Sequence, residues 1–364
     1  MSETGKFFQL DRNAFHAACN VGLNAAVAYI FLACGTDESC RTSTWSTHSI
    51  EKYTGLGRGQ AKRAIEQLID AGLVTQLYAG RGITGRYELV PAYAVAMVIQ
   101  GMKADEVERL AASEPDWIWL PNTLVTGAQN EVPPIERIRR SQDVRILKLL
   151  VELYHVHELA DRGGLPWHIM CHLYERRKVT ERGTWNIWEF TSKNADQVGS
   201  LQARNWFKTD LEGNAIGADA ALKAFWNAWH IIKAAGLVER VDHLVDADSE
   251  DGAIIYPCPY YMGGTDAEQQ VGQAARDAAI NMLGETMGFV ADARGAENES
   301  AHLPVDRAYT EVQMVGVYRL IYRPRTNMTA AWHARQFEYE KMAEGFRALA
   351  ANALEGIPLQ NRIA

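Results

Sequence analysis

Cationic and amide side chains gather on one short stretch of the chain and on a glycine-rich turn that follows it. An arginine can donate two hydrogen bonds to guanine and a glutamine can pair with adenine, whereas lysine and arginine also bind phosphate oxygens. Arg58 and Gln60 are therefore expected to contact base edges, and the remaining members of the set to contact phosphates. The predicted DNA-binding set is Arg58, Gln60, Lys62, Arg63, Arg81 and Arg86.

Two predicted helices position the first four of these side chains. Ser46 and Thr47 offer side-chain oxygens for a helix start, and Gly55 ends this helix after about two turns. In the segment 58–71 that follows, small and apolar residues recur at helical spacing and line one face for the core. This apolar face consists of Ala61, Ala64, Ile65, Leu68 and Ile69. The basic residues of the same helix are then left on the faces that meet solvent.

A β-hairpin is predicted after the second helix. Gly72 stands where a helix C-terminus favours a left-handed residue, and residues 73–78 are rich in β-forming side chains. Three glycines form the tip that carries Arg81, and residues 86–90 return as a second strand that Pro91 ends.

Residues 22–91 resemble the winged helix-turn-helix domains of bacterial transcriptional regulators and of plasmid and phage replication proteins. The matching motifs are Gly55-Leu56-Gly57, Arg58 to Arg63, Ala71-Gly72-Leu73-Val74 and Gly80-Arg81-Gly82. The sequence departs from the family pattern at Gly57, where a capping serine is usual, and at Gly59, where a larger contacting side chain is common. The resemblance implies double-stranded DNA as the partner. The alternative is that these cations are solvated charges on a winged helix that contacts proteins.

A second copy of the motif is suggested by the recurrence of Ala-Gly-Leu-Val at residues 235–238. On this alignment residues 143–157 form the opening helix and residues 165–176 a short second helix. An insertion of about forty residues, 178–217, precedes the third helix. Its aromatic residues are expected to pack against the domain and not to stack on bases. They are Trp185, Trp188, Trp206 and Phe207.

The second copy lacks the chemistry of the first. The positions that align with the basic set are Leu222, Ala224, Trp226 and Asn227. From Glu239 to Glu311 there are fifteen acidic residues and four arginines, so this part of the chain is expected to repel a duplex. Phe225, Trp226 and Trp229 are predicted to form either a buried helix face or a protein interface, through which the acidic half would form a homodimer or bind a protein partner.

The expected fold class is α+β, mainly helical, with tandem winged helix-turn-helix domains and an additional C-terminal α/β region. The domain boundaries follow from the motifs: residues 1–100 for the DNA-binding domain, 101–140 for a linker, 141–260 for the second, degenerate winged-helix domain, and 261–364 for a C-terminal region of unassigned fold. Within that last region, residues 312–322 are predicted to form a strand and residues 330–353 a helix.

Two further groups of basic residues could extend a DNA-binding track, or could be solvated surface charge. The groups are Arg137, Arg139, Arg140, Arg145 and Lys148, and Arg319, Arg323 and Arg325. The overall net charge of −8 is unlike that of a non-specific nucleic-acid coat protein.

No catalytic residue, cofactor or metal is expected. The chain contains no phosphate-binding loop, no Gly-x-Ser-x-Gly and no His-Glu-x-x-His motif. His168, Cys171 and His172 have the spacing of a metal half-site, but a zinc site needs a second pair, and packing on an amphipathic helix is the simpler interpretation. Five scattered cysteines form no disulfide framework, and no apolar stretch is long enough to cross a membrane, so a cytoplasmic protein is expected.

Three functions fit these observations. The first is a plasmid- or phage-type replication initiator that binds specific double-stranded DNA, which the length and the tandem copies favour slightly. The second is a transcriptional regulator, such as a repressor, whose C-terminal part dimerises or senses a ligand. The third is a protein-interaction scaffold or inhibitor that uses winged helices without DNA.

Overall fold

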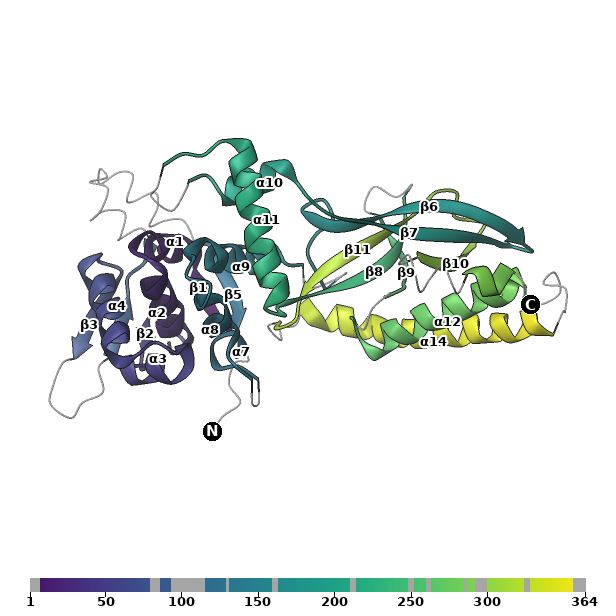
Figure 1. Cartoon of the computed structure of the whole chain (residues 1–364). Helices are drawn as coiled ribbons and strands as arrows, with labels where there is room; N and C mark the ends of the chain where they lie inside the picture. The colour runs from purple at the N-terminus through teal and green to yellow at the C-terminus, as the bar shows by residue number, and fades with distance from the viewer. Residues whose placement is uncertain are drawn as a thin grey trace. The chain divides into compact units, whose positions relative to one another are not determined.

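The computed structural model describes residues 7–78, 86–92, 115–128, 131–158, 163–209, 214–247, 252–259, 263–284, 287–291, 300–323 and 328–355. Contacts within the chain divide it into two units. Unit 1 consists of Met1–Val156, Ala203–Leu237 and Leu320–Arg325, and unit 2 of His157–Gln202, Val238–Arg319 and Thr326–Ala364. Both units are built from separate stretches of the chain, so they do not follow the predicted domain boundaries (Figure 1).

Unit 1 begins with the elements predicted for a winged helix-turn-helix. The helices α1 (Arg12–Val21) and α2 (Leu23–Cys34) are followed by β2 (Thr42–Ser43), α3 (Thr47–Thr54), α4 (Arg58–Asp70), β3 (Val74–Tyr78) and β4 (Arg86–Leu89). The three strands form an antiparallel sheet in the order β2-β4-β3. The helix-turn-helix and its hairpin therefore match the prediction in element type and order.

The local sequence explains where these elements begin and end. Gly55, with φ of 65°, ends α3 in the left-handed region, and Gly72, with φ of 69°, turns the chain from α4 into β3. The apolar face of α4 is buried at Ala61, Ala64 and Leu68, as the helical spacing predicts. It packs on α2, in which every residue from Ala25 to Ala33 is buried.

The predicted linker, residues 101–140, is folded in unit 1 wherever the structure describes it. β5 (Trp117–Pro121) pairs with β1 (Phe7–Asp11), and the short helices α7 (Thr123–Thr126) and α8 (Pro134–Arg139) follow. Alternation of large apolar residues in β5 buries Ile118 and Leu120 completely or almost so.

The remaining helices of unit 1 are α9 (Val144–Val156) and α11 (Ala218–Ala234), together with the second half of α10 (Ser200–Trp206). The opening helix predicted for the second copy is thus present as α9, and its third helix as α11. Glu152 of α9 is buried, receives two hydrogen bonds from Arg12 at 2.8 and 2.7 Å, and receives a third from the indole nitrogen of Trp206. The ion pair connects α1 with α9, and the hydrogen bond from Trp206 connects α9 with α10.

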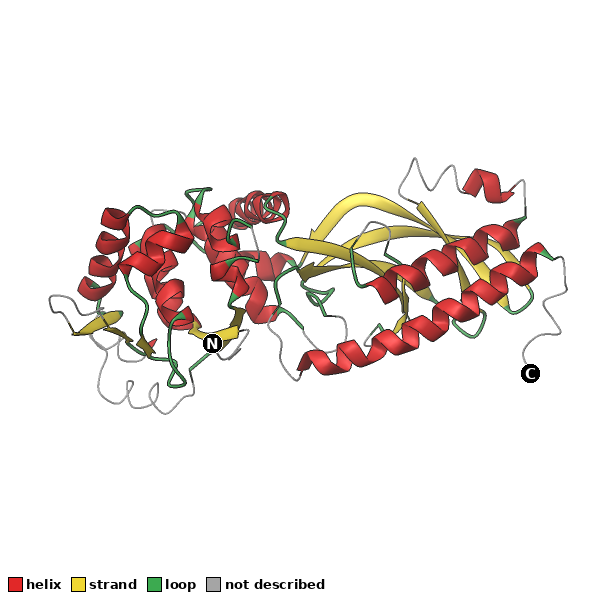
Figure 2. Ribbon diagram, turned by 90° about the horizontal axis from the view of Figure 1, so that it is seen from below, coloured by secondary structure: helices red, strands yellow, loops and turns green. Residues whose placement is uncertain are grey.

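Unit 2 overturns the predicted fold class, because it is a curled antiparallel sheet and not a second winged helix. Its six strands are β6 (Met170–Arg182), β7 (Trp185–Val198), β8 (Val238–Asp246), β9 (Ile254–Pro257), β10 (Ser300–Asp306) and β11 (Val312–Leu320), in the order β10-β7-β6-β11-β8-β9. Two helices, α12 (Asp266–Leu283) and α14 (Met328–Leu354), run side by side along one face of the sheet (Figures 1 and 2).

The prediction of a second winged helix is wrong for the residues between its first and third helices and for those after the third. Residues 165–176, predicted to be a helix, lead into and form part of β6, and the predicted insertion contains most of the β6–β7 hairpin. The acidic stretch from Glu239 to Glu311 contributes most of β8 and all of β9, α12 and β10. The predicted strand 312–322 and helix 330–353 are present as β11 and α14.

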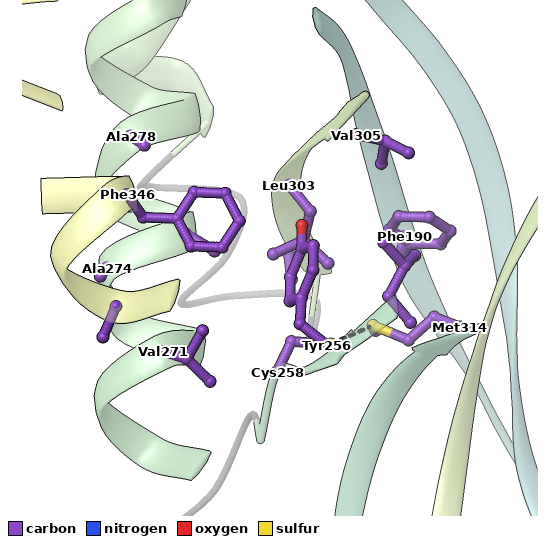
Figure 3. Packing of buried hydrophobic residues seen from close by; sticks show 14 of the residues in the cluster. Phe190, Tyr256, Cys258, Val271, Ala274, Ala278, Leu303, Val305, Met314 and Phe346 are labelled. Atoms are coloured by element: carbon purple, nitrogen blue, oxygen red, sulfur yellow. Dashed lines mark hydrogen bonds between the residues drawn. The ribbon is translucent and has the colours of Figure 1, made fainter. Parts of the chain in front are cut away.

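The core of unit 2 lies between the sheet and the two helices (Figure 3). Small residues of α12, among them Ala274, Ala275 and Ala278, allow α12 to pack closely against α14, whose Phe346 lies in the same cluster. From the strands, Phe190, Leu303 and Met314 fill the other side of this layer. Small residues on one layer and large ones on the other interdigitate, which favours dense packing.

Among the described helices, none has a stretch that is both long and apolar enough to cross a membrane.

Candidate functional site

The exposed face of α4 carries the four predicted contact residues of this helix. Arg58, Gln60, Lys62 and Arg63 are all exposed, while the opposite face of α4 is core. Within the described part of the chain, no carboxylate forms an ion pair with Arg58 or Arg63. Lys62 Nζ lies 3.4 Å from an Oε1 of Glu66, one turn further along the same helix.

The N-terminus of α4 is open to solvent. Gly57 is the N-cap residue, and no side chain caps the first turn. A Cβ atom placed at Gly57 or at Gly59 would meet nothing within 4 Å, so the two departures from the family pattern leave this backbone accessible. Backbone amides at a helix N-terminus attract anions such as phosphate.

The hairpin contributes one further cation that the structure describes. Arg86 is the first residue of β4, is exposed, and lies opposite Tyr78 of β3. Arg81, the other predicted contact of the hairpin, lies outside the described residues. Arg86 and the basic residues of α4 thus belong to the same part of unit 1, which consists of the helix-turn-helix and its three-stranded sheet.

Arg139 of α8 holds the turn between α3 and α4. Its Nε donates a hydrogen bond to the carbonyl oxygen of Thr54 at 2.7 Å, and its Nη2 donates one to the carbonyl oxygen of Gly55 at 3.2 Å. The last carbonyls of a helix have no partner within the helix, and a cation there also interacts favourably with the helix dipole. Arg139 is therefore a structural residue of the helix-turn-helix.

Several of the other basic residues singled out in the sequence form contacts within the fold. Arg137 donates to the carbonyl oxygen of Ala235, Arg140 pairs with Glu136, and Arg145 pairs with Asp143. Arg319 is buried in unit 2. Arg325 lies outside the described residues. Arg137, Arg140, Arg145 and Arg319 therefore have contacts within their own units, and they are not evidence of an extended DNA track.

The aromatic residues of α11 form core. Phe225 and Trp229 are fully buried, and the ring of Phe225 stacks on that of Trp206 with centroids 5.9 Å apart. Trp226 is half-buried. Phe225 and Trp229 therefore have no exposed surface to offer a partner, and of the two predicted alternatives the buried helix face is the one present. Trp206 and Phe207 are buried as well, which confirms the packing interpretation for these two residues.

A cavity of about 740 Å³ lies in unit 1 next to the helix-turn-helix. Its described lining combines aromatic and acidic side chains, including Phe7, Trp45, Trp119, Asp37 and Glu38. Gly35 lies flat against the indole of Trp45, because a Cβ there would come within 2.3 Å of Trp45 Cγ. The Trp45 ring in turn stacks on Tyr53 of α3, with centroids 6.1 Å apart.

A polar centre, defined here as His172, Ser192, Asp196 and Tyr318, lies within the sheet of unit 2. The Nδ1 atom of His172 is 2.9 Å from a carboxylate oxygen of Asp196, and its Nε2 atom is 2.8 Å from Ser192 Oγ. The Tyr318 hydroxyl donates a hydrogen bond to the same Asp196 oxygen. The His172 side chain is 4 % exposed and that of Asp196 11 %, so these bonds form in a largely water-free environment.

A β-bulge brings these side chains together. In the β6–β7 pairing His172 lies opposite Asp196, but the next regular pair is Tyr174 opposite Ser192. The register shift places both Ser192 and Asp196 beside His172. Bulges are frequent next to active sites because they redirect side chains in this way.

The polar centre borders a charged pair. A Cβ at Gly316 of β11 would lie 2.8 Å from His172 Cβ, 2.9 Å from Arg240 Cδ and 2.9 Å from Asp242 Oδ1. Glycine is therefore required where these side chains converge. Burial raises the pKa of the Tyr318 hydroxyl, and the adjacent Asp196 raises it further, so Tyr318 stays protonated and donates to the carboxylate.

Sequence reasoning did not identify the polar centre. In the sequence, His172 stands out only for its spacing to His168 and Cys171 on a predicted helix. The structure instead has Cys171 and His172 as successive residues of β6, whose side chains point to opposite faces. Among the described residues no group of three or more potential ligands is arranged to hold a metal ion. The other residues of the polar centre lie on the strands β7 and β11, and no local sequence motif predicts them.

Comparisons of this chain with protein-family models, with curated proteins and with solved structures find no match.

Proposed function

We propose that the protein binds double-stranded DNA, with α4 in the major groove and the β3–β4 hairpin against the neighbouring backbone. The observation that carries this proposal is the exposure of Arg58, Gln60, Lys62 and Arg63 on the second helix of a helix-turn-helix whose other face is core. The open N-terminus of α4 and the exposed Arg86 support it, because both suit contact with phosphate.

The arrangement of the DNA sites near the gene would distinguish between two biological roles, a replication initiator and a transcriptional regulator. The preference for a plasmid- or phage-type replication initiator depended partly on tandem winged helices, and unit 2 removes that support. A transcriptional regulator is then an equal candidate. Repeated sites near the gene would indicate an origin of replication, and a single palindrome would indicate an operator. For either role we propose a cytoplasmic location, consistent with five cysteines that are all free.

The test uses the full chain and duplexes selected from a random pool, with affinity measured by fluorescence anisotropy at several salt concentrations. The Arg58→Ala, Lys62→Ala, Arg63→Ala triple variant should bind at least about a hundredfold more weakly and with a flatter salt dependence. Arg58→Ala alone should cost about 1 to 3 kcal/mol and relax the preference at one base pair.

The matched control removes the same charge from another part of unit 1. Arg204, Lys208 and Lys223 are exposed cations outside the helix-turn-helix, so their triple alanine variant should keep nearly all of the affinity. Equal losses of DNA affinity in the two triple variants would mean that binding depends on net charge alone and not on the exposed face of α4. Selection of no duplex, or unchanged binding after the first triple substitution, would overturn the proposal and favour a winged helix that contacts protein.

The cavity beside α3 favours a second candidate, a regulator whose DNA binding responds to a small ligand. Aromatic walls together with Asp37 and Glu38 suit an organic cation, which interacts with both π-faces and carboxylates. Benzylamine is a suitable probe, and we expect it to raise the melting temperature and change the affinity for DNA. Trp119→Ala should abolish both effects; a response that survives this substitution would exclude the cavity as the site.

A further inference from the structure

We propose that unit 2 carries a hydrolytic centre in which Ser192 is the nucleophile, His172 the general base and Asp196 the residue that orients the base, and that its substrates are carboxylic esters. This activity is independent of the proposed DNA binding. The proposal depends on the continuous hydrogen-bond chain from Ser192 Oγ through both ring nitrogens of His172 to Asp196, with distances of 2.8 and 2.9 Å.

The partners of His172 determine its tautomer. An ionised carboxylate can only accept hydrogen bonds, so Asp196 requires the proton of a neutral imidazole to be on Nδ1. The Nε2 atom then carries the lone pair, and Ser192 Oγ–H donates to it. This is the protonation state in which a serine can be activated, since the proton leaves Oγ toward Nε2 as the oxygen attacks.

Asp196 is itself held in place by the Tyr318 hydroxyl, which donates to the oxygen that accepts from His172. The β-bulge sets the position of Asp196 relative to Ser192 along β7. Arg240 borders the polar centre, since its Cδ atom and the Cβ atom of His172 both flank Gly316, and its Nε atom lies 3.3 Å from Asp242 Oδ1. A cation near the reacting carbonyl would favour the negative charge that develops on its oxygen.

The reaction is written in two steps that need only the ester and water. Ser192 Oγ bonds to the carbonyl carbon while His172 Nε2 accepts the serine proton. The carbon–oxygen bond to the alcohol then breaks, and the alcohol leaves with that proton. Water next attacks the acyl-serine and gives its proton to His172, and the carboxylic acid and free Ser192 are released with the proton returned to Oγ.

The first experiment labels the full chain with a fluorophosphonate probe, which modifies activated serines, and identifies the modified residue by mass spectrometry. We expect modification at Ser192. His172→Gln should lower the labelling rate by about a hundredfold or more, because the base is lost. The control is Ser300→Ala: Ser300 is also a buried serine of this sheet, but among the described residues its hydroxyl has no hydrogen-bond partner, so its loss should leave labelling unchanged.

A second measurement follows the hydrolysis of p-nitrophenyl acetate. A burst of one nitrophenolate per chain, followed by slower turnover, would report the acyl-serine, and Ser192→Ala should abolish it. Circular dichroism and the melting temperature of each variant show whether it is folded. Absence of labelling at Ser192 in the folded wild-type chain overturns the proposal, and so does equal labelling of wild type and folded His172→Gln. The network would then be a purely structural one.

Discussion

Arg319 of β11 donates one hydrogen bond to each carboxylate oxygen of Glu268 in α12, both at 2.7 Å, and neither side chain is exposed by more than 1 %. His243 Nε2 lies 3.2 Å from the second guanidinium nitrogen. Glu268 also closes a capping box with Thr265 at the start of α12. The pair therefore ties the first turn of α12 to the sheet of unit 2.

Replacing Glu268 with glutamine should destabilise unit 2 severely. The substitution keeps the volume but leaves the Arg319 charge buried without its counter-ion, which costs about 3 to 5 kcal/mol. Urea denaturation followed by circular dichroism measures the loss. Glu175→Gln is the control, since the Lys193–Glu175 pair is exposed and long at 3.6 Å and should change the unfolding free energy by no more than about 1 kcal/mol. Similar losses in the two variants would contradict the role of burial.

The stability of the protein should fall in acid. Burial would raise the pKa of Glu268, but the charge and hydrogen bonds of Arg319 outweigh this effect and lower the pKa to about 2. Burial is likewise outweighed at Glu152, where His16 and Arg12 lower the pKa to about 2. A carboxyl whose folded-state pKa is depressed stabilises the fold above its unfolded pKa, near 4.5, and loses this contribution as the pH falls toward 2.

Thermal unfolding between pH 6 and pH 2.5 checks this dependence. The melting temperature should decline below about pH 4.5 as the unfolded chain takes up protons that the folded carboxylates do not. Glu268→Gln should show a shallower decline, because one of the two groups is gone. A melting temperature that stays constant over this range would show that neither carboxylate has a depressed pKa.

Arg139→Met should weaken DNA binding without removing a DNA contact. The side chain no longer donates to the carbonyls of Thr54 and Gly55, and loss of charge-assisted hydrogen bonds of this kind costs about 1.5 to 3 kcal/mol of stability. The melting temperature should fall, and the affinity should fall while the slope of its salt dependence stays the same. Arg140→Met, which removes the adjacent arginine paired with Glu136, is the control. A reduced salt slope for Arg139→Met alone would mean that Arg139 contacts phosphate.

Glu66→Gln should strengthen DNA binding. Glu66 lies 3.4 Å from Lys62 on the exposed face of α4, so it both neutralises this cation and opposes phosphate. Its removal should raise affinity severalfold at low salt, and the gain should shrink as salt screens the charges. Lys62→Ala tested in parallel should have the opposite effect. Weaker binding by Glu66→Gln would indicate that α4 does not face DNA.

The helix-turn-helix could be predicted because its signals are local. The helical spacing predicts the buried face of Ala61, Ala64 and Leu68, and the glycines Gly55 and Gly72, which adopt left-handed φ angles, indicate where the helices end. The second copy shares one such signal, since Gly236 has φ of 65° and leads from α11 into β8 as Gly72 leads from α4 into β3. The predicted step from a helix through Gly236 into a strand is therefore confirmed, but the second winged helix inferred from this step is wrong.

The sheet of unit 2 could not be predicted because its pairings are distant in sequence. β11 joins β6 through Val317 opposite Cys171, and β10 joins β7 through Ser300 opposite Thr191. The polar centre has the same origin: His172, Ser192 and Tyr318 meet only through strand register and a bulge. The spacing of residues within one segment cannot predict contacts of this kind. The role of Arg139 at the end of α3 could not be predicted for the same reason, because Arg139 and Thr54 are far apart in sequence.

The interleaving of the two units determines when each can fold during synthesis. The last part of unit 1 is Leu320–Arg325, where Tyr322 accepts a hydrogen bond from Arg137 through its hydroxyl and one from the Tyr154 hydroxyl through its carbonyl oxygen. Unit 1 is thus incomplete until residues 320–325 have been synthesised, although its helix-turn-helix is made early. A premature stop before residue 320 would deprive both units of packing partners at once, because unit 1 would lack Leu320–Arg325 and unit 2 would lack α14.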